Sequence, residues 1–408
     1  MDLIIRNARL SDRGGEALDI GIANGRIVAI ERGIAADARV YDAQGCLACP
    51  GLIETHIHLD KSRIIDRCAP QPRASLSPVK GVTPLKKDMT VEDVRARAAA
   101  TIEQCILHGA TRMRTQVEVD PGIGMRGYEG VEQLIADYKW AIDIEICVFP
   151  QEGLISFPGT DELLVEGLRR GAKVLGGAPR YDTDEAGQIR RIFELAREFD
   201  VDIDMHLDVG NTPDAMNIHL VRELTDRFKR GGRVVVGHMA KLSLLPPDQL
   251  EVLARQMADS GIAVTVLPAT DLFLMGRDRE HSVVRGVADA NFLCEHGVNC
   301  SLSSNNILNP ATPYGDCSLI RMANLYANVL QVDAPSRLRD CFDMLTTRSA
   351  RLMNLKDYGF AVGNPADVVI IDARSAEQAV AEIARPLAAF KNGKPTVAWE
   401  RPQLIRPR

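Results

Sequence analysis

The stretch GLIETHIHLD, at residues 51–60, decides the fold prediction because a short apolar run ends there in two histidines. Pro50 and Gly51 introduce the run, and its apolar residues predict a β-strand that is buried on both faces. Side chains alternate along a strand, so His56 and His58 face the same side and can bind one metal ion. A His-x-His pair alone is weak evidence, since two histidines hydrogen-bonded in a loop give the same pattern.

Length, composition and charge narrow the class of protein. The chain has 408 residues, of which 46% are hydrophobic and 25% charged, which fits one large barrel with a small satellite domain. The net charge of −6 argues against a nucleic-acid partner, because phosphate binding needs a basic surface. Apolar runs stay short of the roughly 18 residues that a membrane helix needs, and the first residues lack the features of a signal peptide. We therefore expect a cytoplasmic protein with no membrane partner.

Nine cysteines are scattered through the chain, mostly inside apolar runs. Dispersed cysteines in odd number are typical of free buried thiols in a reducing cytosol. Cys46 and Cys49 form a C-x-x-C pair, a spacing that also occurs in redox and zinc sites. No second C-x-x-C follows in the sequence, so we interpret this pair as structural.

Strand and helix patterns alternate through the middle of the chain. Eight short apolar runs end in polar residues, and from the second onward they recur roughly every 30 residues, as strand-plus-helix units do. The predicted strands cover residues 49–58, 111–119, 142–151, 173–179, 201–208, 233–239, 263–269 and 299–306. Helical patterns lie between them at residues 91–105, 188–199, 216–228, 248–260 and 282–296, the first with Thr90 as its cap. This alternation predicts an α/β fold, a (β/α)8 TIM barrel.

The two ends of the chain differ from this middle part. Short strand patterns with glycine turns precede the barrel, and similar patterns return near the other end, at residues 366–371, 388–391 and 395–398. We expect both ends to pair into one small β-sandwich domain. The predicted domains are the sandwich, residues 1–48 plus 362–408, and the barrel, residues 49–361.

A TIM barrel carries its functional groups at the carboxyl ends of its strands, so the polar residues there are the candidates for the site. They are His56, His58, Gln151, His206, Asp208, His238, Asn305 and Asn306. Four of the eight histidines thus fall at the ends of three strands that a barrel brings together. Imidazoles suit zinc and iron(II), and such a site lowers the pKa of a bound water toward neutrality. For the other histidines a surface or structural role is usual; they are His108, His219, His281 and His296.

At this point the chain resembles the amidohydrolase superfamily, and in particular its cytosine deaminase branch. The likeness rests on the His-x-His strand, on FPQEG at residues 149–153, on His206 and His238, and on the tail that begins with DYG at residues 357–359. It extends over nearly the whole chain, including the β-sandwich divided between the two ends. Proteins of this branch are often homo-oligomers that act on small heterocyclic substrates.

The resemblance also implies roles for individual residues. One divalent metal ion, zinc or iron, is bound by His56, His58 and His206. His238 polarises the attacked group or contacts the water at the metal. Gln151 hydrogen-bonds the amide edge of a heterocyclic substrate.

Two positions depart from the family pattern. Val209 stands where the branch has a proton-shuttling glutamate, and Asn305 stands where it has a metal-binding aspartate. Each general acid–base role is worth roughly 10²–10⁴-fold in rate, so unreplaced losses would nearly abolish the family chemistry. Asp208 is the first candidate to replace the missing acid–base groups, because it faces the same side as the strand-five histidine two residues before it. Alternatively, Asp208 has a structural role and caps the following turn. Glu152 and Asp271 also lie at the expected rim.

The segment NNILNPATPYGD, at residues 305–316, is unusually polar for a barrel mouth. Ala311 stands there where deaminases of this branch typically have a tryptophan. These features suit either a pocket reshaped for another substrate or a plain loop whose asparagines and prolines set turns. The candidate catalytic residues are thus His238, Asp208 and Asn305, and the candidate substrate-binding residues are Gln151 and Asn306.

The sequence therefore favours a metal-dependent hydrolase that acts on a non-peptide C–N bond of a small nitrogen heterocycle or cyclic amide. Opening of a cyclic amide tolerates the loss at Val209 better than deamination does, because it needs less proton delivery to a ring nitrogen. Two alternatives stay open on the same fold: a metal-free lyase or isomerase, and a catalytically silent ligand-binding protein. The metal content of the purified protein separates the metal-free enzyme from the hydrolase.

Overall fold

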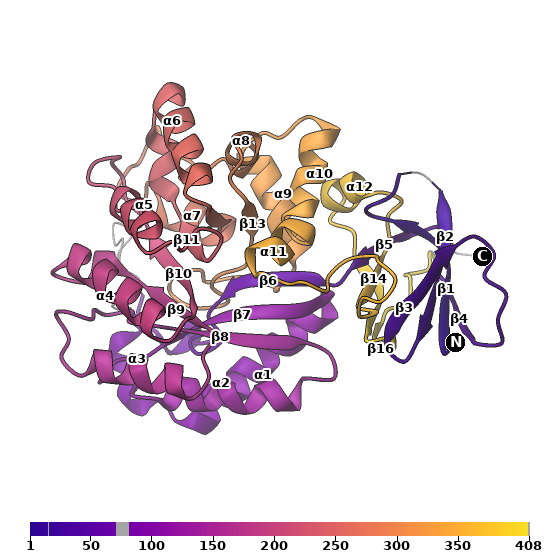
Figure 1. The fold of residues 1–408 in the computed structure, drawn as a ribbon, viewed down its shortest axis with the longest axis horizontal. Coiled ribbons are helices and arrows are strands. Elements are labelled where there is room, and N and C mark those ends of the chain that lie inside the picture. Colours follow the sequence, from indigo (N-terminus) through magenta and orange to yellow (C-terminus); the bar gives the residue numbers. More distant parts are fainter. Residues whose placement is uncertain (15, 71–80, 407–408) are drawn as a thin grey trace.

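Eight parallel strands form one sheet in the computed structural model, which describes residues 1–14, 16–70 and 81–406 (Figure 1). The strands are β6 Leu52–Ile57, β7 Ala110–Glu118, β8 Asp143–Phe149, β9 Val174–Gly177, β10 Asp202–Leu207, β11 Val234–His238, β12 Ile262–Val266 and β13 Cys300–Leu302. They pair in sequence order, as in a TIM barrel. Most of their residues are buried, which explains the apolar runs of the sequence. The predicted fold is confirmed.

The barrel is nearly closed between its first and last strands. Beyond β13, the Asn305 amide donates to the carbonyl of His56, and the His58 amide donates to the carbonyl of Asn305, both at 2.9 Å. Within the barrel, the hydroxyls of Thr55 and Ser301 lie 2.8 Å apart. The seam therefore holds the backbone of the His-x-His pair against the polar loop that follows the last strand.

Helices cover the outside of the barrel (Figure 1). The α-helices are α1 Val91–Leu107, α2 Arg126–Asp137, α3 Thr160–Arg169, α4 Glu185–Glu198, α5 Ile218–Arg227, α6 Pro247–Asp259, α7 Pro268–Leu274, α8 Ala290–Glu295, α9 Leu319–Val329, α10 Pro335–Asp343, α11 Thr347–Leu352 and α12 Ala376–Ala381. Short 3-10 turns are η1 Ile65–Arg67, η3 Thr83–Asp88, η4 Pro179–Tyr181 and η5 Ala240–Leu244. Thr90 caps α1 as predicted, its hydroxyl accepting from the Asp93 amide at 3.2 Å. Within the described ranges, no helix combines the length and apolar character needed to cross a membrane.

Both ends of the chain build a second eight-stranded sheet beside the barrel (Figure 1). Its strands are β1 Leu3–Leu10, β2 Ala17–Ala23, β3 Arg26–Glu31, β4 Arg39–Asp42, β5 Leu47–Pro50, β14 Val368–Ile371, β15 Pro386–Lys391 and β16 Lys394–Ala398. The sheet is mixed, because β1 pairs parallel with β4 and β5 but antiparallel with β2. β14 pairs antiparallel with β5, which joins the two ends as expected. Ile5, Ile370 and Phe390 belong to its separate hydrophobic core.

The first predicted strand, residues 49–58, consists of two strands that belong to different sheets. β5 ends at Pro50 in the mixed sheet, and β6 begins at Leu52 in the barrel. Gly51 lies between them, and a Cβ at this position would come within 1.9 Å of the Thr111 hydroxyl. Only glycine lets the chain pass so close to β7, so the prediction of one continuous strand is wrong here. The domain limits near residues 48 and 362 stay predictions.

The helix predicted at residues 282–296 is also wrong over its first half. Helix α8 begins only at Ala290, and Asp289 caps it by accepting from the Phe292 amide at 2.9 Å. Before the cap, Gly286 has a φ of +68°, and a Cβ there would come within 2.1 Å of Met275. This close approach requires a left-handed glycine, which interrupts a helix.

Two predicted strands are shorter in the structure. β13 ends at Leu302, so residues 303–306 form the polar loop at the seam. β12 ends at Val266, because Pro268 begins helix α7, where its missing N–H costs no hydrogen bond. The first change moves polar residues from a strand into a loop, and the second moves Pro268 and Ala269 from a strand into helix α7.

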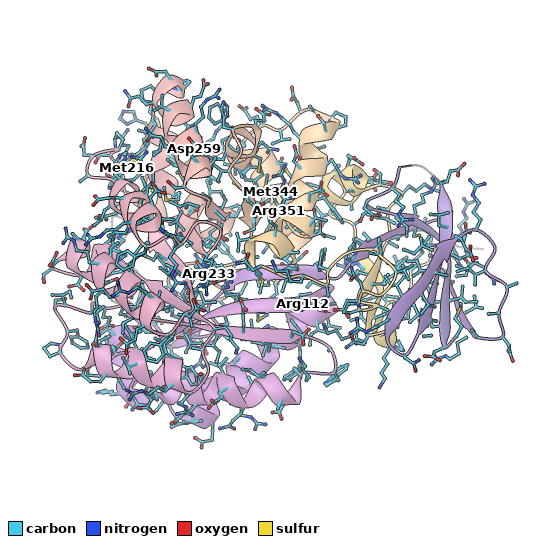
Figure 2. All side chains as sticks on the ribbon, in the orientation of Figure 1. Arg112, Met216, Arg233, Asp259, Met344 and Arg351 are labelled. Atoms are coloured by element: carbon cyan, nitrogen blue, oxygen red, sulfur yellow. The ribbon has the colours of Figure 1, made fainter. Side chains whose placement is uncertain are left out.

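A buried lysine connects the mixed sheet to the barrel. Lys391, at the end of β15, lies 2.6 Å from Asp367 and 2.7 Å from Asp143, and it donates to the Thr111 carbonyl at 3.2 Å. Figure 2 shows Arg112 on the side of the barrel that faces the mixed sheet. Its guanidinium lies 3.6 Å from Asp143. Charged groups from both sheets therefore meet at this contact.

All nine cysteines are free thiols. Cys46 and Cys49 are buried in the mixed sheet region, and the Arg401 guanidinium donates to the Cys46 sulfur at 2.9 Å. Burial raises the pKa of the Cys49 thiol. The thiolate is the form that binds metals and attacks disulfides, so this environment supports the structural interpretation of the pair.

Candidate functional site

Three histidines bring their Nε2 atoms together at the carboxyl end of the barrel. His206 Nε2, from β10, lies 3.2 Å from His56 Nε2 and 3.0 Å from His58 Nε2, both from the end of β6. Ligand atoms about 2.0–2.1 Å from a tetrahedral zinc ion lie about 3.3 Å apart, close to these separations. Burial lowers the pKa of all three imidazoles, which favours the neutral, metal-binding form. These residues fit one divalent ion, as predicted.

The surroundings of His56 orient its ring. Its Nδ1 lies 3.3 Å from the Gln116 amide nitrogen and 3.6 Å from Asp204. The buried Asp204 is itself held by Arg114, whose guanidinium donates to it at 3.0 Å. Partners of this kind fix the ring of a metal-binding histidine so that the other nitrogen faces the metal. None of these three residues stands out in the sequence, because they lie inside the barrel on β7 and β10.

Asn305 lies at the seam with an unpaired side chain. Its backbone is hydrogen-bonded to His56 and His58, and its side chain is fully buried. Among the residues that the structure describes, neither its Oδ1 nor its Nδ2 has a hydrogen-bond partner. A buried amide without partners is costly, which favours a ligand at this position. As a neutral group it adds no charge to a metal site made of neutral imidazoles.

His238, at the end of β11, faces the buried carboxylate of Asp271. The distance from His238 Nδ1 to Asp271 Oδ1 is 2.6 Å. Asp271 lies in α7, directly after β12, and its other oxygen accepts from the Leu267 amide at 3.3 Å. The sequence predicted His238 as a catalytic candidate and Asp271 as a rim residue but not their contact, because the contact depends on where α7 begins.

Three residues at strand ends share a left-handed backbone. The φ angles are +50° for Asp208, +72° for His238 and +60° for Asn305. Such angles are uncommon outside glycine and cost of order 1–3 kcal/mol when strained, less for Asn, Asp and His than for bulky residues. Other non-glycine residues far from the site, such as Asn24 and Asn392, adopt such angles too, so the angles here mark the turns that leave the strands.

Asp208 lines the cavity, but its carboxylate already has partners. Its two oxygens accept from the backbone amides of Asn217 at 2.8 Å and Ile218 at 3.0 Å, at the start of helix α5. Burial raises the pKa of this carboxyl, and its effect outweighs that of the two hydrogen bonds, which lower the pKa. The structural alternative considered for Asp208, a cap, is therefore present in the structure; a catalytic role stays a prediction.

A cavity of about 300 Å³ opens beside the histidines. Its lining residues include His58, His206, His238, Gln151, Lys61, Asn306, Val209, Ala215 and Leu274. Lys61 is the functional candidate that sequence reasoning missed, although it follows the His-x-His strand directly. Its ammonium donates to the side-chain oxygen of Gln151 at 2.7 Å and lies 3.2 Å from Glu118. The cavity lining thus combines polar and apolar side chains.

A second group of carboxylates lies behind Lys61. Glu118, Asp120 and Glu152 come close enough to hold a cation, but the buried ammonium of Lys86 already contacts all three. Burial opposes ionisation of Glu118, yet Lys61 and Lys86 lower its pKa to about 2. Burial and the nearby Glu118 raise the pKa of Asp120 to about 6. Glu152 therefore belongs to an ion-pair cluster, in which its carboxylate contacts the Lys86 ammonium.

The asparagines of the polar loop hold its turns. The Asn309 side chain donates to Asn306 at 2.7 Å, and its oxygen accepts from the amides of Ala311 and Thr312 at 2.9 and 3.2 Å. Asn306 also lines the cavity, as a substrate-binding residue must. The turns of this loop are thus held by its own asparagine, while a pocket reshaped for another substrate stays a prediction.

The remaining histidines lie elsewhere. His108 and His296 follow the last residues of α1 and α8, and His296 stacks on Phe292. His219 and His281 are exposed. None of these four belongs to a metal-binding group among the described residues.

A family model described as the amidohydrolase family matches residues 79–397. The chain belongs to the amidohydrolase family. Over 404 residues it is 29% identical to N-isopropylammelide isopropyl amidohydrolase of Pseudomonas sp. (strain ADP), covering 96% of each protein. It is 24% identical to a pterin deaminase of Rhizobium rhizogenes, over 89% of this chain and 84% of that protein.

Solved structures of amidohydrolases have the same fold over their whole length. A 5-methylcytosine deaminase from Klebsiella pneumoniae, bound to 5-fluorocytosine, superposes with a TM-score of 0.94 at 28% identity, covering 99% of both chains. N-isopropylammelide isopropylaminohydrolase from Burkholderia multivorans superposes with a TM-score of 0.85 at 26% identity, covering 97% of this chain and 98% of the other. The resemblance inferred from the strand-end histidines is thereby confirmed.

Proposed function

We propose that this amidohydrolase is a metal-dependent hydrolase that releases an amine or ammonia from an oxo-substituted nitrogen heterocycle. The observation that carries the proposal is the convergence of three Nε2 atoms, from His56, His58 and His206, beside a cavity that His58 and His206 line. Its size, about 300 Å³, suits a small molecule. The similarity to enzymes named for isopropylammelide and 5-methylcytosine supports the same substrate class.

The three histidines would hold one zinc or iron ion, with the Asn305 amide beside them. When bound, such an ion polarises the attacked carbon's substituent and lowers the pKa of water, which makes hydrolysis possible near neutral pH. The protein's own residues then bind and orient the heterocycle. His238 lines the cavity next to His206, with ring centroids 5.5 Å apart, and this position supports assigning proton transfer to it.

The polar side chains of the cavity favour a carbonyl-bearing ring. The Gln151 oxygen already accepts a hydrogen bond from Lys61, so the amide nitrogen of Gln151 is left to donate. The Lys61 ammonium has only donors as well. Two neighbouring donors, one of them charged, bind a carbonyl oxygen or a deprotonated ring nitrogen better than they bind an amino group.

Apolar residues also line the cavity, one of them at the position where the family's glutamate is missing. Val209 lines the cavity together with Ala215 and Leu274. This surface accepts an alkyl group on the departing nitrogen, since burial of each methylene contributes about 0.8 kcal/mol. Among aminated heterocycles we therefore expect N-alkylated ones to be better substrates than the unsubstituted amines.

The proposal is tested by amine release from a panel of compounds. Protein loaded with zinc or iron is incubated with N-isopropylammelide, ammelide, cytosine, 5-methylcytosine, pterin and a cyclic imide, and released amine, ammonia or ring-opened acid is measured. We expect release from an oxo-heterocycle, faster for the N-alkyl compound, and loss of activity in a His206→Ala variant. If ring opening is the only reaction observed, the substrate is a cyclic amide and the proposed release of an amine is wrong. If fully metallated protein binds these rings saturably without turnover, the protein is a ligand-binding protein and not an enzyme.

A further inference from the structure

Several ionisable groups line the cavity, among them Glu185, whose carboxylate accepts a hydrogen bond from the Asn217 side chain. The site lacks a carboxylate at Val209 and at Asn305, and Asp208 accepts two backbone hydrogen bonds from helix α5. Lys61 is held by Glu118 and Gln151, and Lys241 donates to the Asp214 carbonyl at 2.9 Å. His238 differs from these groups, because its partner engages only the ring nitrogen that faces Asp271.

We propose that Asp271 is a positioning residue that fixes His238 in one tautomer and thereby makes Nε2 of His238 the proton carrier of the reaction. The inference rests on the proposed hydrolysis and adds to it the group that replaces the missing acid–base residues. Asp271 is completely buried, and the 2.6 Å separation from Nδ1 is that of a short, charge-assisted hydrogen bond. A carboxylate at this distance accepts, so Nδ1 carries the hydrogen.

This arrangement determines what the other side of the ring can do. With its hydrogen on Nδ1, a neutral imidazole has a lone pair on Nε2, which can accept a proton. His238 lines the cavity and is only 5% exposed, so its ring is shielded from bulk water. The left-handed backbone of His238, at a φ of +72°, places the residue at the turn that leaves β11, between the metal-site histidines and α7.

Asp271 is itself held in place independently of His238. Its second oxygen accepts from the Leu267 amide, at the junction of β12 and α7. The helix therefore fixes the carboxylate, and the carboxylate fixes the ring. A carboxylate that orients a catalytic histidine while staying ionised is the arrangement known from hydrolytic triads.

The proton balance of the proposed reaction closes with one histidine. As the water oxygen bonds to the substrate carbon, one water proton passes to Nε2 of His238. As the C–N bond breaks, the same proton passes from Nε2 to the departing nitrogen, which leaves as an amine or ammonia. The second water proton stays with the product oxygen, and Asp271 stays a carboxylate throughout.

The decisive variant is Asp271→Asn in the metal-loaded, full-length enzyme. An asparagine oxygen can still accept from the Leu267 amide, but the amide nitrogen would donate to Nδ1 and force the hydrogen onto Nε2. We expect kcat for amine release to fall by about 10²-fold while KM changes by less than about threefold. Asp289→Asn is the matched control, because Asp289 also caps a helix, α8, but lies outside the cavity lining.

Two further measurements separate a positioning role from a structural one. In a double-mutant cycle, Asp271→Asn has no further effect on kcat in a His238→Asn background, since it acts only through that ring. Proton NMR of the enzyme shows a low-field imidazole N–H resonance that His238→Asn and Asp271→Asn both abolish and Asp289→Asn retains. The NMR result does not depend on turnover, so it tests the tautomer even if the proposed substrates are wrong. Full kcat in Asp271→Asn, additive effects in the cycle, or no such resonance in the wild type would each overturn the proposal.

Discussion

Asn305 is the residue that most sets this site apart from the pattern of its family. Its amide lies buried beside His56 and His58 without a hydrogen-bond partner in the described part of the chain. A metal bound there keeps its full positive charge, because imidazoles and amides are neutral. We therefore expect the proposed site to bind divalent ions less tightly than one with a carboxylate, and to leave more positive charge for an electron-rich substrate.

Replacing this amide with a carboxylate should strengthen metal binding. We expect Asn305→Asp to lower the Kd for zinc by about tenfold or more, since an added ligand charge is attracted to the ion. Competition with a chromogenic chelator measures the Kd. Asn306→Asp is the matched control, because it adds the same charge one residue further along. An unchanged Kd in Asn305→Asp would mean that the residue is not next to the metal.

The sequence was most informative about residues whose type and position both carry chemistry. The four strand-end histidines could be predicted, because imidazoles are rare in this chain and a barrel brings strand ends together. Lys61 and the pairing of His238 with Asp271 could not, because both depend on contacts between residues that lie far apart in the sequence. The sequence did not decide between a cap and a catalytic role for Asp208, since aspartate serves in both.

At the scale of elements, the loop after β8 depends on one carboxylate. Asp182 accepts from the backbone amides of Leu154 at 2.6 Å, Ile155 at 2.9 Å and Ser156 at 3.0 Å. Partial burial opposes its ionisation, but these hydrogen bonds and one from Gln188 outweigh it and lower its pKa to about 2. The loop that begins at Gln151 is thereby anchored to the segment after β9.

We expect Asp182→Asn to loosen this loop. Ordinary hydrogen bonds contribute about 0.5–1.5 kcal/mol each, and a charged acceptor makes stronger ones, so the variant should be cleaved faster within residues 152–158 by limited proteolysis. Because Gln151 binds the substrate in the proposed function, KM should rise as well. Asp184→Asn, which changes the nearby cap of α4, is the control. Equal cleavage rates in both variants would contradict the anchoring role.

The same carboxylate predicts a pH dependence. Its folded pKa, about 2, lies below the ordinary value of 3.8, so its contribution to stability is present above pH 3.8 and is lost as the pH falls toward 2. The protection of the loop in wild-type protein should therefore weaken over that range. Asp182→Asn should show no such change, because its side chain does not titrate.

Helices and strands could be predicted where the local sequence pattern determines them. The predictions were wrong where a close contact in the folded chain determines where an element begins or ends. Strand order and the cap of α1 followed from patterns that each segment carries by itself. The break at Gly51 and the late start of α8 follow from approaches to Thr111 and Met275, which only the folded chain contains. These contacts cannot be inferred from local composition.

At the scale of the whole molecule, Lys391 ties the two sheets together. Its ammonium is 2% exposed and lies between Asp367 of the mixed sheet region and Asp143 of the barrel. Removing one partner of a buried ion pair leaves an uncompensated charge, which costs about 3–5 kcal/mol. The association of the sheets therefore depends strongly on this side chain.

We expect Lys391→Met to lower the free energy of unfolding by about 3–5 kcal/mol in urea denaturation. Lys394→Met is the control, because Lys394 lies on the next strand and is exposed. The unfolding curve should also broaden if the mixed sheet now melts separately. A loss no larger than that of the control would show that the two sheets are held together by other contacts.

The proposed metal site is tested most directly by the metal content of the protein. Elemental analysis measures this content after expression with added zinc or iron. The convergence of His56, His58 and His206 predicts about one ion per chain in the wild type, and a large loss in His206→Ala but not in His219→Ala, which changes an exposed histidine. Less than about one ion per ten chains under every loading condition would contradict the metal site, and with it the proposed hydrolysis.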